Sequence, residues 1–473
     1  MKNQVTRRHF LATAGAAASI TFLSEPWFDS GSAQAAVPLV RRDVGKMDAS
    51  DAILVAYGNA ITVMKARSTS DPLSWTYQAA IHGTQLPQAL TAWNTCEHWT
   101  DFFWSWHRMY LYWFERIIRK MSNEPCWALP YWDWAPGSEL QLPGPFRNTA
   151  SPLYTANRNA AMNNGTGTLN PLAIDIGPSF ANTNFFTTNN QIQGPHGSVH
   201  VETGGWMSDP STAAQDPIFY LHHSNVDRQW NLWLAQGGGR SDPLGDANWR
   251  NRQFTFFDEN GAQVQMSACQ ILRAAQQLNY VYECEPPQVK QYCRRIFPPW
   301  PWEREVILRL PPPPELGPEP VTFPIELKEL RSRLAATAES TSETVLLELD
   351  DVESEKSPEA VWAVYVGPEP VREQADEKSP YFVGSLSLFG AGIRSEKHRE
   401  FKPAHLLFRL NRALQSALKG NAERVEVSFV PIGIVIEGKP SRAEVKSRVR
   451  IGKANLVLER RKEQPKEGNE KPE

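Results

Sequence analysis

The chain has 473 residues, of which 49 are basic and 52 acidic. Single hydrophobic cores rarely grow beyond about 250–300 residues, so this length predicts two or three domains. The charge is nearly balanced, and no long run of one sign occurs before the last dozen residues. This balance argues against a nucleic-acid or membrane-surface partner and favours a small uncharged one, and it leaves the oligomeric state open.

The first 35 residues predict an export signal. Arg7 and Arg8 precede an apolar run too short to span a bilayer, and Ala33-Gln34-Ala35 provides a small-residue cleavage site. Paired arginines are typical of the twin-arginine route, which exports folded proteins, so a metal site could be assembled before transport to the periplasm or the medium. No later segment has about 18 consecutive apolar residues, and we expect a soluble mature protein.

The next region, 36–297, is predicted to be helical with long loops. Residues 136–190 are rich in Gly, Pro, Asn and Thr and should be largely loop. The segment 100–121 is expected to form a long, mostly buried helix. The segments with apolar residues at helical spacing or with helix-end signals are 51–64, 100–121, 196–200 and 217–234.

A proline-dense stretch follows, and the hydrophobic period then changes from helical to alternating. We interpret 298–340 as a semi-rigid linker, 341–460 as a β-sandwich domain and 461–473 as a disordered tail. The strands expected in the β-sandwich are 344–352, 360–366, 381–389, 424–437 and 449–459.

Seven of the ten histidines fall between positions 82 and 223, in two clusters. In the second cluster His196 and His200 are four residues apart, so on a helix both side chains project from one face and can share a metal ion. His222 and His223 follow on another predicted helix, and one of this pair offers a third ligand. The spacing does not decide which of the two binds.

The first cluster consists of His82, His98 and His107. Nine residues separate His98 from His107, which turns an α-helix by roughly 900° and leaves the two side chains on opposite faces. We therefore expect His107 on the long helix, His98 in the loop that enters it, and His82 in a loop of the preceding segment.

Six imidazoles, three for each of two ions, favour copper or zinc and argue against magnesium or calcium. A hydrolytic zinc site would need a nearby acid as general base, and GPHGSVH at 194–200 contains none. Two facing copper ions can instead bind dioxygen, which points to redox chemistry. Copper storage is disfavoured because storage sites use soft thiolate or thioether ligands.

The strings around these histidines resemble those of type-3 copper proteins, namely tyrosinases, catechol oxidases and haemocyanins. The resemblance rests on FWSWHRMYLYWFER, DPIFYLHHSNVDRQWNLW and LPYWDW. Farther along, VLLELDDV, YFVGSL, VSFVPIGIVIEG and LNYVYE resemble plant-type polyphenol oxidases. The resemblance covers nearly the whole mature chain, is strongest over 75–283, and implies a helical-bundle dicopper core followed by a C-terminal β-sandwich.

Carried over position by position, the resemblance also implies a ligand set for two copper ions. In the family the second member of the His-His pair binds, which leaves His222 in a structural role. The string Cys96-Glu97-His98 resembles members that form a thioether, which implies a bond between the side chains of Cys96 and His98. The implied ligands are His82, His98 and His107 for one copper, and His196, His200 and His223 for the other.

The activity implied is the oxidation of a small phenolic substrate, an o-diphenol, to an o-quinone with O₂. Family members with strong monophenol hydroxylation often carry a Glu before, and an Asn directly after, the first ligand of the second site. This chain has Gln193 and Gly197 there. Because an amide is not a base and glycine has no side chain, we predict weak or absent monophenolase activity. A true tyrosinase is the alternative; an oxygen carrier is disfavoured by the bacterial export signal.

Two further residues are candidates for the surroundings of the site. Pro210 is expected near its entrance, and Asp227 either orients a ligand histidine or pairs locally with Arg228. In the family a C-terminal domain can cover the coppers, which implies a latent enzyme with a blocking side chain near 382–389. Cleavage would then fall in the proline-rich linker. A merely stabilising domain is the alternative.

The five cysteines are too few for a disulfide scaffold. Cys284 and Cys293 could pair after export, and we expect Cys126 and Cys269 to be buried thiols.

Overall fold

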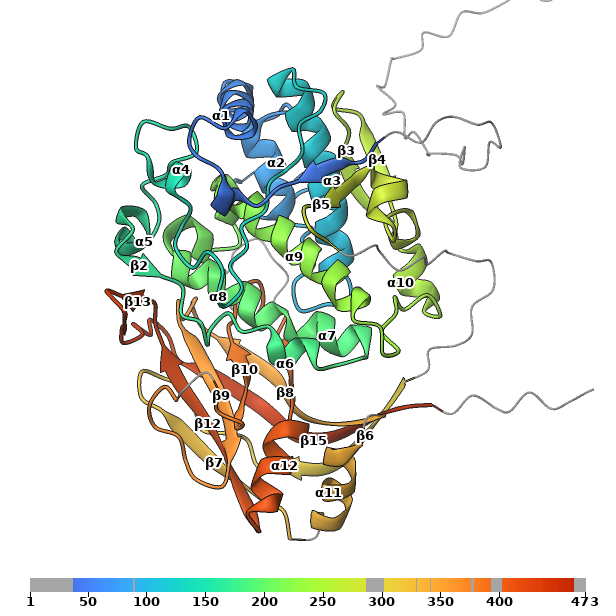
Figure 1. Cartoon of the computed structure of the whole chain (residues 1–473), viewed down its shortest axis with the longest axis vertical. Coiled ribbons are helices and arrows are strands. Elements are labelled where there is room, and N and C mark those ends of the chain that lie inside the picture. The colour runs from blue at the N-terminus through green and yellow to red at the C-terminus, as the bar shows by residue number, and fades with distance from the viewer. Residues whose placement is uncertain are drawn as a thin grey trace, which may run out of the picture.

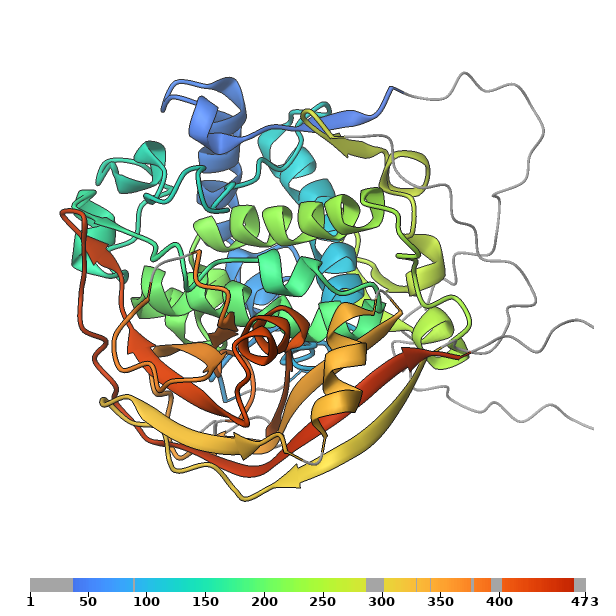
Figure 2. The ribbon, with the colours of Figure 1, turned by 60° about the horizontal axis from the view of Figure 1, so that its bottom comes forward.

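The computed structural model describes residues 37–87, 90–285, 302–328, 330–340, 342–375, 378–392 and 402–462. The predicted signal at 1–35, Cys293 and the predicted tail after residue 462 lie outside these ranges. Figure 1 shows helices, coloured blue to yellow-green, above strands coloured yellow to red. In Figure 2 the strands form a curved layer beneath the helices. None of the helices in the described part of the chain is long and apolar enough to cross a membrane.

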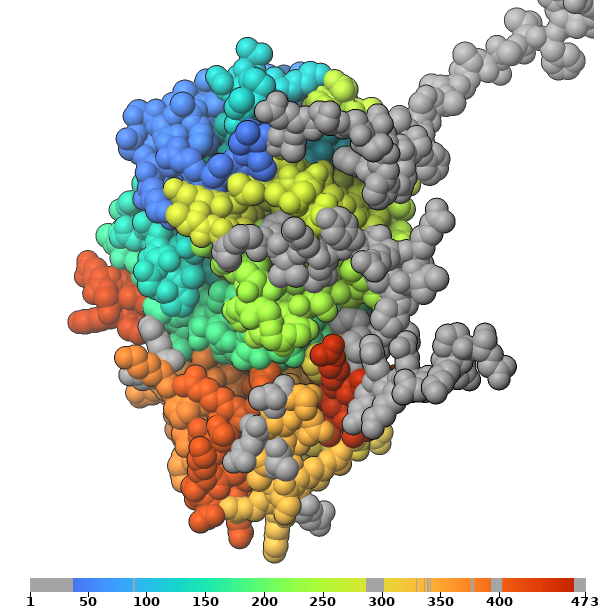
Figure 3. Space-filling model, turned by 45° about the vertical axis from the view of Figure 1, so that its right-hand side comes forward, coloured from blue at the N-terminus to red at the C-terminus, as the bar shows by residue number. Residues whose placement is uncertain are grey.

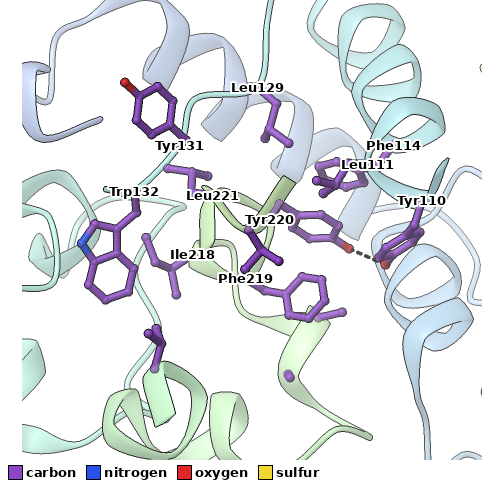
Figure 4. Close-up of a cluster of buried hydrophobic side chains, with 14 of the residues drawn as sticks. Tyr110, Leu111, Phe114, Leu129, Tyr131, Trp132, Ile218, Phe219, Tyr220 and Leu221 are labelled. Atoms are coloured by element: carbon purple, nitrogen blue, oxygen red, sulfur yellow. Dashed lines mark hydrogen bonds between the residues drawn. The ribbon is translucent and has the colours of Figure 1, made fainter. Parts of the chain in front are cut away.

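Two long helices form the centre of the helical region. α3 (Phe103–Ser122) is buried over most of its length and ends where Asn123 adopts a left-handed conformation, and α9 (Ile218–Ala235) is buried almost throughout. The hydroxyls of Tyr110 on α3 and Tyr220 on α9 lie 3.1 Å apart (Figure 4), and Phe114 stacks on Tyr220 with 3.5 Å between ring centroids. Stacked and hydrogen-bonded aromatic rings therefore hold α3 against α9.

Shorter elements surround these two helices, and several begin at side chains suited to capping. Asp51 accepts a hydrogen bond from the backbone N–H of Ile53, and Ser74 accepts one from that of Tyr77. The remaining elements are β1 (Leu39–Arg41), α1 (Ala52–Lys65), α2 (Trp75–His82), α4 (Gly144–Arg147), α5 (Ala160–Asn164), β2 (Gly167–Thr168), α6 (Gly177–Phe180), α7 (Phe185–Gln191), α8 (Gln193–Thr203), α10 (Ala247–Asn251), β3 (Phe254–Phe257), β4 (Gln263–Met266) and β5 (Tyr280–Tyr282).

Within the described residues, the C-terminal region contains two four-stranded sheets, with the orders β10-β9-β12-β7 and β11-β8-β15-β6, while its β13 and β14 form a small sheet with β2 of the helical region. All their strand pairs are antiparallel, and the apolar side chains between the sheets form a core of their own. The elements are β6 (Trp302–Leu310), β7 (Val321–Glu326), α11 (Arg331–Glu339), β8 (Glu343–Ser354), β9 (Val361–Gly367), β10 (Phe382–Leu386), β11 (Ala404–Arg409), α12 (Asn411–Lys419), β12 (Arg424–Ile432), β13 (Val435–Ile436), β14 (Lys439–Pro440) and β15 (Val449–Arg461).

The predicted fold class, a helical core followed by a β-sandwich, is confirmed. The five expected strand segments correspond to β8, β9, β10, β12 with β13, and β15. The linker prediction for 298–340 is wrong from Trp302 onward, because β6 pairs with β15 and β7 with β12. Proline density hid these strands, which lie at sheet edges where a missing backbone N–H is tolerated.

The two regions pack against each other along α7, α8 and several strands, and in Figure 3 the orange and red surface abuts the green one. Buried Glu459 of β15 accepts hydrogen bonds from Asn184 (2.8 Å) and Thr187 (2.6 Å), and Arg304 of β6 donates to the same carboxylate at 2.8 Å. Asn190 of α7 donates to the carbonyl oxygen of His405. Buried polar contacts thus supplement apolar packing at this interface.

Candidate metal centre

Seven histidine side chains from five segments gather at the centre of the helical region, and each is at most 5 % exposed. His98 lies in the loop before α3, as predicted, whereas His82 is the last residue of α2 rather than part of a loop. The α2 helix continues to Gly83, whose extended backbone ends it. The other five are His107 on α3, His196 and His200 on α8, and His222 and His223 on α9.

Three imidazole nitrogens of the second cluster converge on one point. His223 Nε2 lies 3.4 Å from His196 Nε2 and 3.3 Å from His200 Nε2. Two nitrogens bound to one tetrahedral metal at about 2.0–2.1 Å are separated by about 3.3–3.4 Å. The backbone carbonyl of Met207 accepts from Nδ1 of His200 at 2.9 Å, which orients that ring with Nε2 inward.

His222 lies beside this trio but differs from it in geometry. Its ring stacks on that of His196 with 5.0 Å between centroids and 15° between planes. Within the described residues, neither of its ring nitrogens has a hydrogen-bond partner. Burial lowers the pKa of His222 well below the usual range, so the ring is neutral. It is close enough to share a metal site with the other three histidines, and proximity alone does not remove it from the ligand set.

The first cluster is oriented by backbone carbonyls in the same way. Nδ1 of His82 faces the carbonyl oxygen of Pro210 at 3.0 Å, and Nδ1 of His107 faces that of Phe103 at 2.8 Å. Each contact turns the Nε2 of that ring toward the centre. The ring centroid of His98 lies 5.1 Å from that of His82 and 5.1 Å from that of His107. The three rings therefore form a second compact group.

The two groups face each other. His107 stacks on His223 with 4.3 Å between ring centroids, and His98 stacks on His196 at 5.5 Å. Burial holds the pKa of His196 and His223 well below the usual range and lowers that of His200 to about 3. Neutral imidazole is the form that binds metal, so the donor set and its protonation suit two closely spaced copper or zinc ions.

The other residues predicted near the site have specific partners. Pro210 is buried, and its carbonyl orients His82, so it contacts a ring of the site directly. Gln193 accepts a hydrogen bond from the backbone N–H of Trp99 and donates to the carbonyl of Asn189 at 3.0 Å. Both ends of its amide are therefore engaged.

The carboxylate of Asp227 forms no hydrogen bond or ion pair with the seven histidines or with Arg228. It forms buried ion pairs with Arg108 and with Arg41, the latter at 3.2 Å, and accepts hydrogen bonds from Tyr280 and Tyr282 at 2.6 Å each. Burial alone would raise the pKa of Asp227, but the two guanidinium groups hold it below its usual value. This carboxylate connects α9 to α3, β1 and β5.

Sequence reasoning did not single out the residue that covers the centre, Phe389. Phe389 comes shortly after β10, and its ring stacks on that of His200 with 3.7 Å between centroids and 9° between planes. It also lies 5.3 Å from the ring of His98 and 5.7 Å from that of His196. The indole N–H of Trp99 donates to its backbone carbonyl at 3.0 Å. The sequence pointed to Phe389 only through its position at the end of the segment 382–389, in which a blocking side chain was expected.

The cysteine predictions require correction. Cys284 is an exposed thiol that forms no disulfide, so its predicted pairing with Cys293 is wrong, whereas Cys269 is disulfide-bonded. Cys126 is exposed rather than buried. Cys96 is not in a disulfide, and its Sγ lies 3.3 Å from Nδ1 of His98. Cysteine spacing carries no information on which pair the fold brings together.

Comparison with known proteins identifies similar sequences. The family model described as the common central domain of tyrosinase matches residues 72–173 and 155–236, and that of the polyphenol oxidase middle domain matches 243–291. A tyrosinase of Hahella sp. (strain CCB-MM4) is 37% identical over 288 residues, covering 49% of this chain and 61% of the relative. A latent chloroplastic polyphenol oxidase of Prunus armeniaca is 30% identical over 290 residues, covering 50% and 47%. The chain thus spans about half to three fifths of the length of these relatives.

Solved structures share the fold over nearly the whole chain. Latent aurone synthase, described as a polyphenol oxidase, superposes with a TM-score of 0.66 at 19% identity, covering 94% of this chain and 93% of its own. Latent apple tyrosinase gives a TM-score of 0.63 at 23% identity, covering 93% of this chain and 100% of its own. At these identities the likeness concerns the arrangement of helical core and C-terminal sheets.

Proposed function

The chain belongs to the tyrosinase and polyphenol oxidase family of type-3 copper enzymes, and we propose that it oxidises o-diphenols to o-quinones with O₂. The observation that carries this proposal is the convergence of three neutral imidazoles. Nε2 of His223 lies 3.3–3.4 Å from Nε2 of His196 and of His200, and these rings face a second imidazole group. In balance, two diphenols lose four electrons and four protons to one O₂, which yields two quinones and two waters.

We assign one copper to His82, His98 and His107, and the other to His196, His200 and His223. The assignment for the second ion is supported by the Nε2 distances among His196, His200 and His223, whereas neither ring nitrogen of His222 has a hydrogen-bond partner among the described residues. When bound, the two ions supply the O₂ binding and electron transfer that protein side chains lack. The backbone carbonyls of Pro210, Phe103 and Met207 keep three of the ligand rings oriented.

The substrate ring would occupy the position of Phe389. The face of His200 accepts an aromatic ring there, and the surrounding imidazoles exclude water from that face. A small, uncharged phenol suits this environment better than a charged ligand, because a buried charge without a partner is costly.

Weak or absent monophenol hydroxylation is supported by the residues around His196. Gln193 cannot accept a proton, and both ends of its amide are engaged by Trp99 and Asn189. Gly197 provides no side chain to hold a water molecule. The alternative, a true tyrosinase, would require a base from elsewhere. Comparable rates of oxygen consumption with a monophenol and with its catechol would contradict our proposal.

We further propose that the full chain is latent. Phe389 fills the position where a phenol would stack, and its segment belongs to the C-terminal sheets. Limited proteolysis between the two regions should raise diphenol oxidation severalfold in the copper-loaded protein. Equal activity before and after cleavage would favour a C-terminal domain that only stabilises the core.

The central test combines metal analysis with activity. We expect two copper ions per chain, loss of one in His223→Ala, and retention of both in the matched neighbour variant His222→Ala. Two coppers without catechol oxidation after cleavage would indicate an oxygen carrier. A single zinc ion would exclude the dicopper assignment.

Two finer proposals rest on local sequence. A thioether between Cys96 and His98 should lower the intact mass by about two hydrogens and resist alkylation under reducing conditions, whereas an alkylatable Cys96 would exclude it. Twin-arginine export should fail when Arg7 and Arg8 are both changed to lysine, and unchanged export would contradict it.

A further inference from the structure

The segment that covers the centre fits against α8 at two glycines. We call residues 385–390 the covering segment; it begins with the last two residues of β10 and continues beyond that strand. A Cβ atom added at Gly194 would lie 2.3 Å from the backbone oxygen of Ser385. One added at Gly197 would lie 2.7 Å from Oγ and 3.0 Å from Cβ of Ser387, and 3.2 Å from Cβ of Phe389. Real Cβ atoms do not approach backbone oxygens this closely, so the contact requires glycine on α8.

The two glycines are three residues apart and therefore lie on one face of α8. Ser198, on the same face, lies with its Oγ 3.5 Å from Oγ of Ser385. His196 and His200 project from the neighbouring face toward the centre. The helix thus presents imidazoles on one side and, beside them, a surface whose only side chain among these positions is the small hydroxymethyl group of Ser198, and the covering segment occupies that surface.

Two further contacts hold the covering segment in place. Gln193 holds the backbone N–H of Trp99, and the Trp99 indole donates to the carbonyl of Phe389 at 3.0 Å. Gly390 has a φ of +89°, and a Cβ there would lie 2.4 Å from Cγ of His98. Only glycine both adopts this backbone conformation without strain and leaves room for the imidazole.

We propose that Gly194 and Gly197, with Gln193 acting through Trp99, form the seat of the covering segment, and that the absence of a side chain at these two positions of α8 determines how firmly the centre is closed. The inference rests on the proposed latency and assigns its structural basis. It gives Gln193 and Gly197 a role in closure that is separate from any effect on monophenol hydroxylation.

The test uses full-length, copper-free protein and measures hydrogen exchange of the amides in 385–392. We expect protection in the unmodified chain and exchange faster by about tenfold or more in Gly197→Ala, the effect of overpacking a closed contact by about 1.4 kcal/mol. Ser387→Gly removes the two nearest of the three atoms that the new methyl group would meet and leaves Cβ of Phe389 at 3.2 Å, so the double variant should regain part of the protection. Gly58→Ala is the matched control, because its Cβ would meet only Pro152 at 3.5 Å or more in the α1 helix.

A second substitution approaches the same contact from the other side. Ser387→Val enlarges the covering segment and leaves α8 unchanged, so it keeps the test decisive if Gly197→Ala does not fold. The copper-loaded variants are then compared by the ratio of diphenol oxidation before and after proteolysis. Unchanged exchange and an unchanged ratio in both variants would overturn the seat. A ratio near one in the unmodified chain would instead contradict latency, and the exchange data would still decide whether the seat exists.

Discussion

The first prediction concerns Asp227, which was expected either to orient a ligand histidine or to pair with Arg228 and instead joins the helices that carry His107 and His223. It lies one turn after His223 on α9, and its partner Arg108 directly follows His107 on α3. Asp227→Asn keeps the size and shape of the side chain and removes its charge. Two buried guanidinium groups then lose a counterion, although Arg41 retains Glu115.

The expected loss of unfolding free energy is large because the ion pairs of Asp227 are shielded from water. Arg41, Arg108 and Asp227 are at most 2 % exposed. Removing one partner of a buried ion pair costs about 3–5 kcal/mol, since the remaining charge stays desolvated. The control is Glu259→Gln, a carboxylate-to-amide change opposite Arg116 of α3 in a pair with 32% and 27% of the side chains exposed. A pair this accessible contributes about 1 kcal/mol or less.

The assay is denaturant unfolding of the copper-free protein followed by tryptophan fluorescence. Only three of the 17 tryptophans lie beyond residue 290, so the signal reports mainly the helical region. The folded-state pKa of Asp227 is depressed, so its stabilisation is present above the usual Asp pKa of about 3.9 and is lost as pH falls through the lower folded value. The difference between Asp227→Asn and the unmodified chain should therefore narrow in acid. At neutral pH, a loss of unfolding free energy no larger than that of Glu259→Gln would refute the reasoning.

Three further predictions address the interface and the buried acids. Glu459→Gln removes the charge that strengthens the hydrogen bonds donated by Asn184 and Thr187 across the domain interface, so limited proteolysis should be faster; an unchanged cleavage rate would contradict this. Phe389→Ala removes the ring stacked on His200, so the uncleaved, copper-loaded chain should oxidise diphenols faster, and activity equal to that of the unmodified chain would argue against blocking. Burial raises the pKa of Glu202 to about 8. Between about pH 4.3 and 8 the unfolded chain loses the proton of this carboxyl group while the folded chain keeps it, so Glu202 destabilises the fold increasingly as pH rises over this range. Glu202→Gln should gain stability over the unmodified copper-free chain across this range, and a pH-independent difference would exclude that explanation.

The place of most individual histidines on a helix or in a loop follows from local spacing, and this is why the sequence could predict it, whereas their gathering into two facing groups was implied by the family resemblance. The four-residue step from His196 to His200 is a property of any α-helix. The nine-residue step from His98 to His107 allowed the loop and the helix to be distinguished, and the structure has His98 and His107 in those places. His82 was misplaced because nothing in its neighbourhood marks where α2 ends, apart from an ordinary glycine.

Features that depend on contacts between distant segments could not be derived in the same way. Asp227 lies 186 positions from Arg41 and 119 from Arg108, and no local pattern links them. The strands hidden in the proline-rich segment were missed because proline suits an edge strand as well as a linker. The same holds for the disulfide, since spacing in the chain does not state which cysteines the fold brings together.

Gly197 illustrates how the structure changes the meaning of a residue that sequence reasoning had already selected. Its lack of a side chain was interpreted through chemistry, as the absence of a group that could hold a water molecule beside His196. In the fold the same position contacts Ser387, more than 180 residues away, and an added Cβ there would force Ser387 and Phe389 to shift while the centre is covered. Introducing Asn at 197 therefore perturbs closure and catalysis together in the full chain. Only after the C-terminal domain has been removed does the ratio of monophenol to diphenol turnover report the chemistry alone, so the two roles must be measured on the two forms separately.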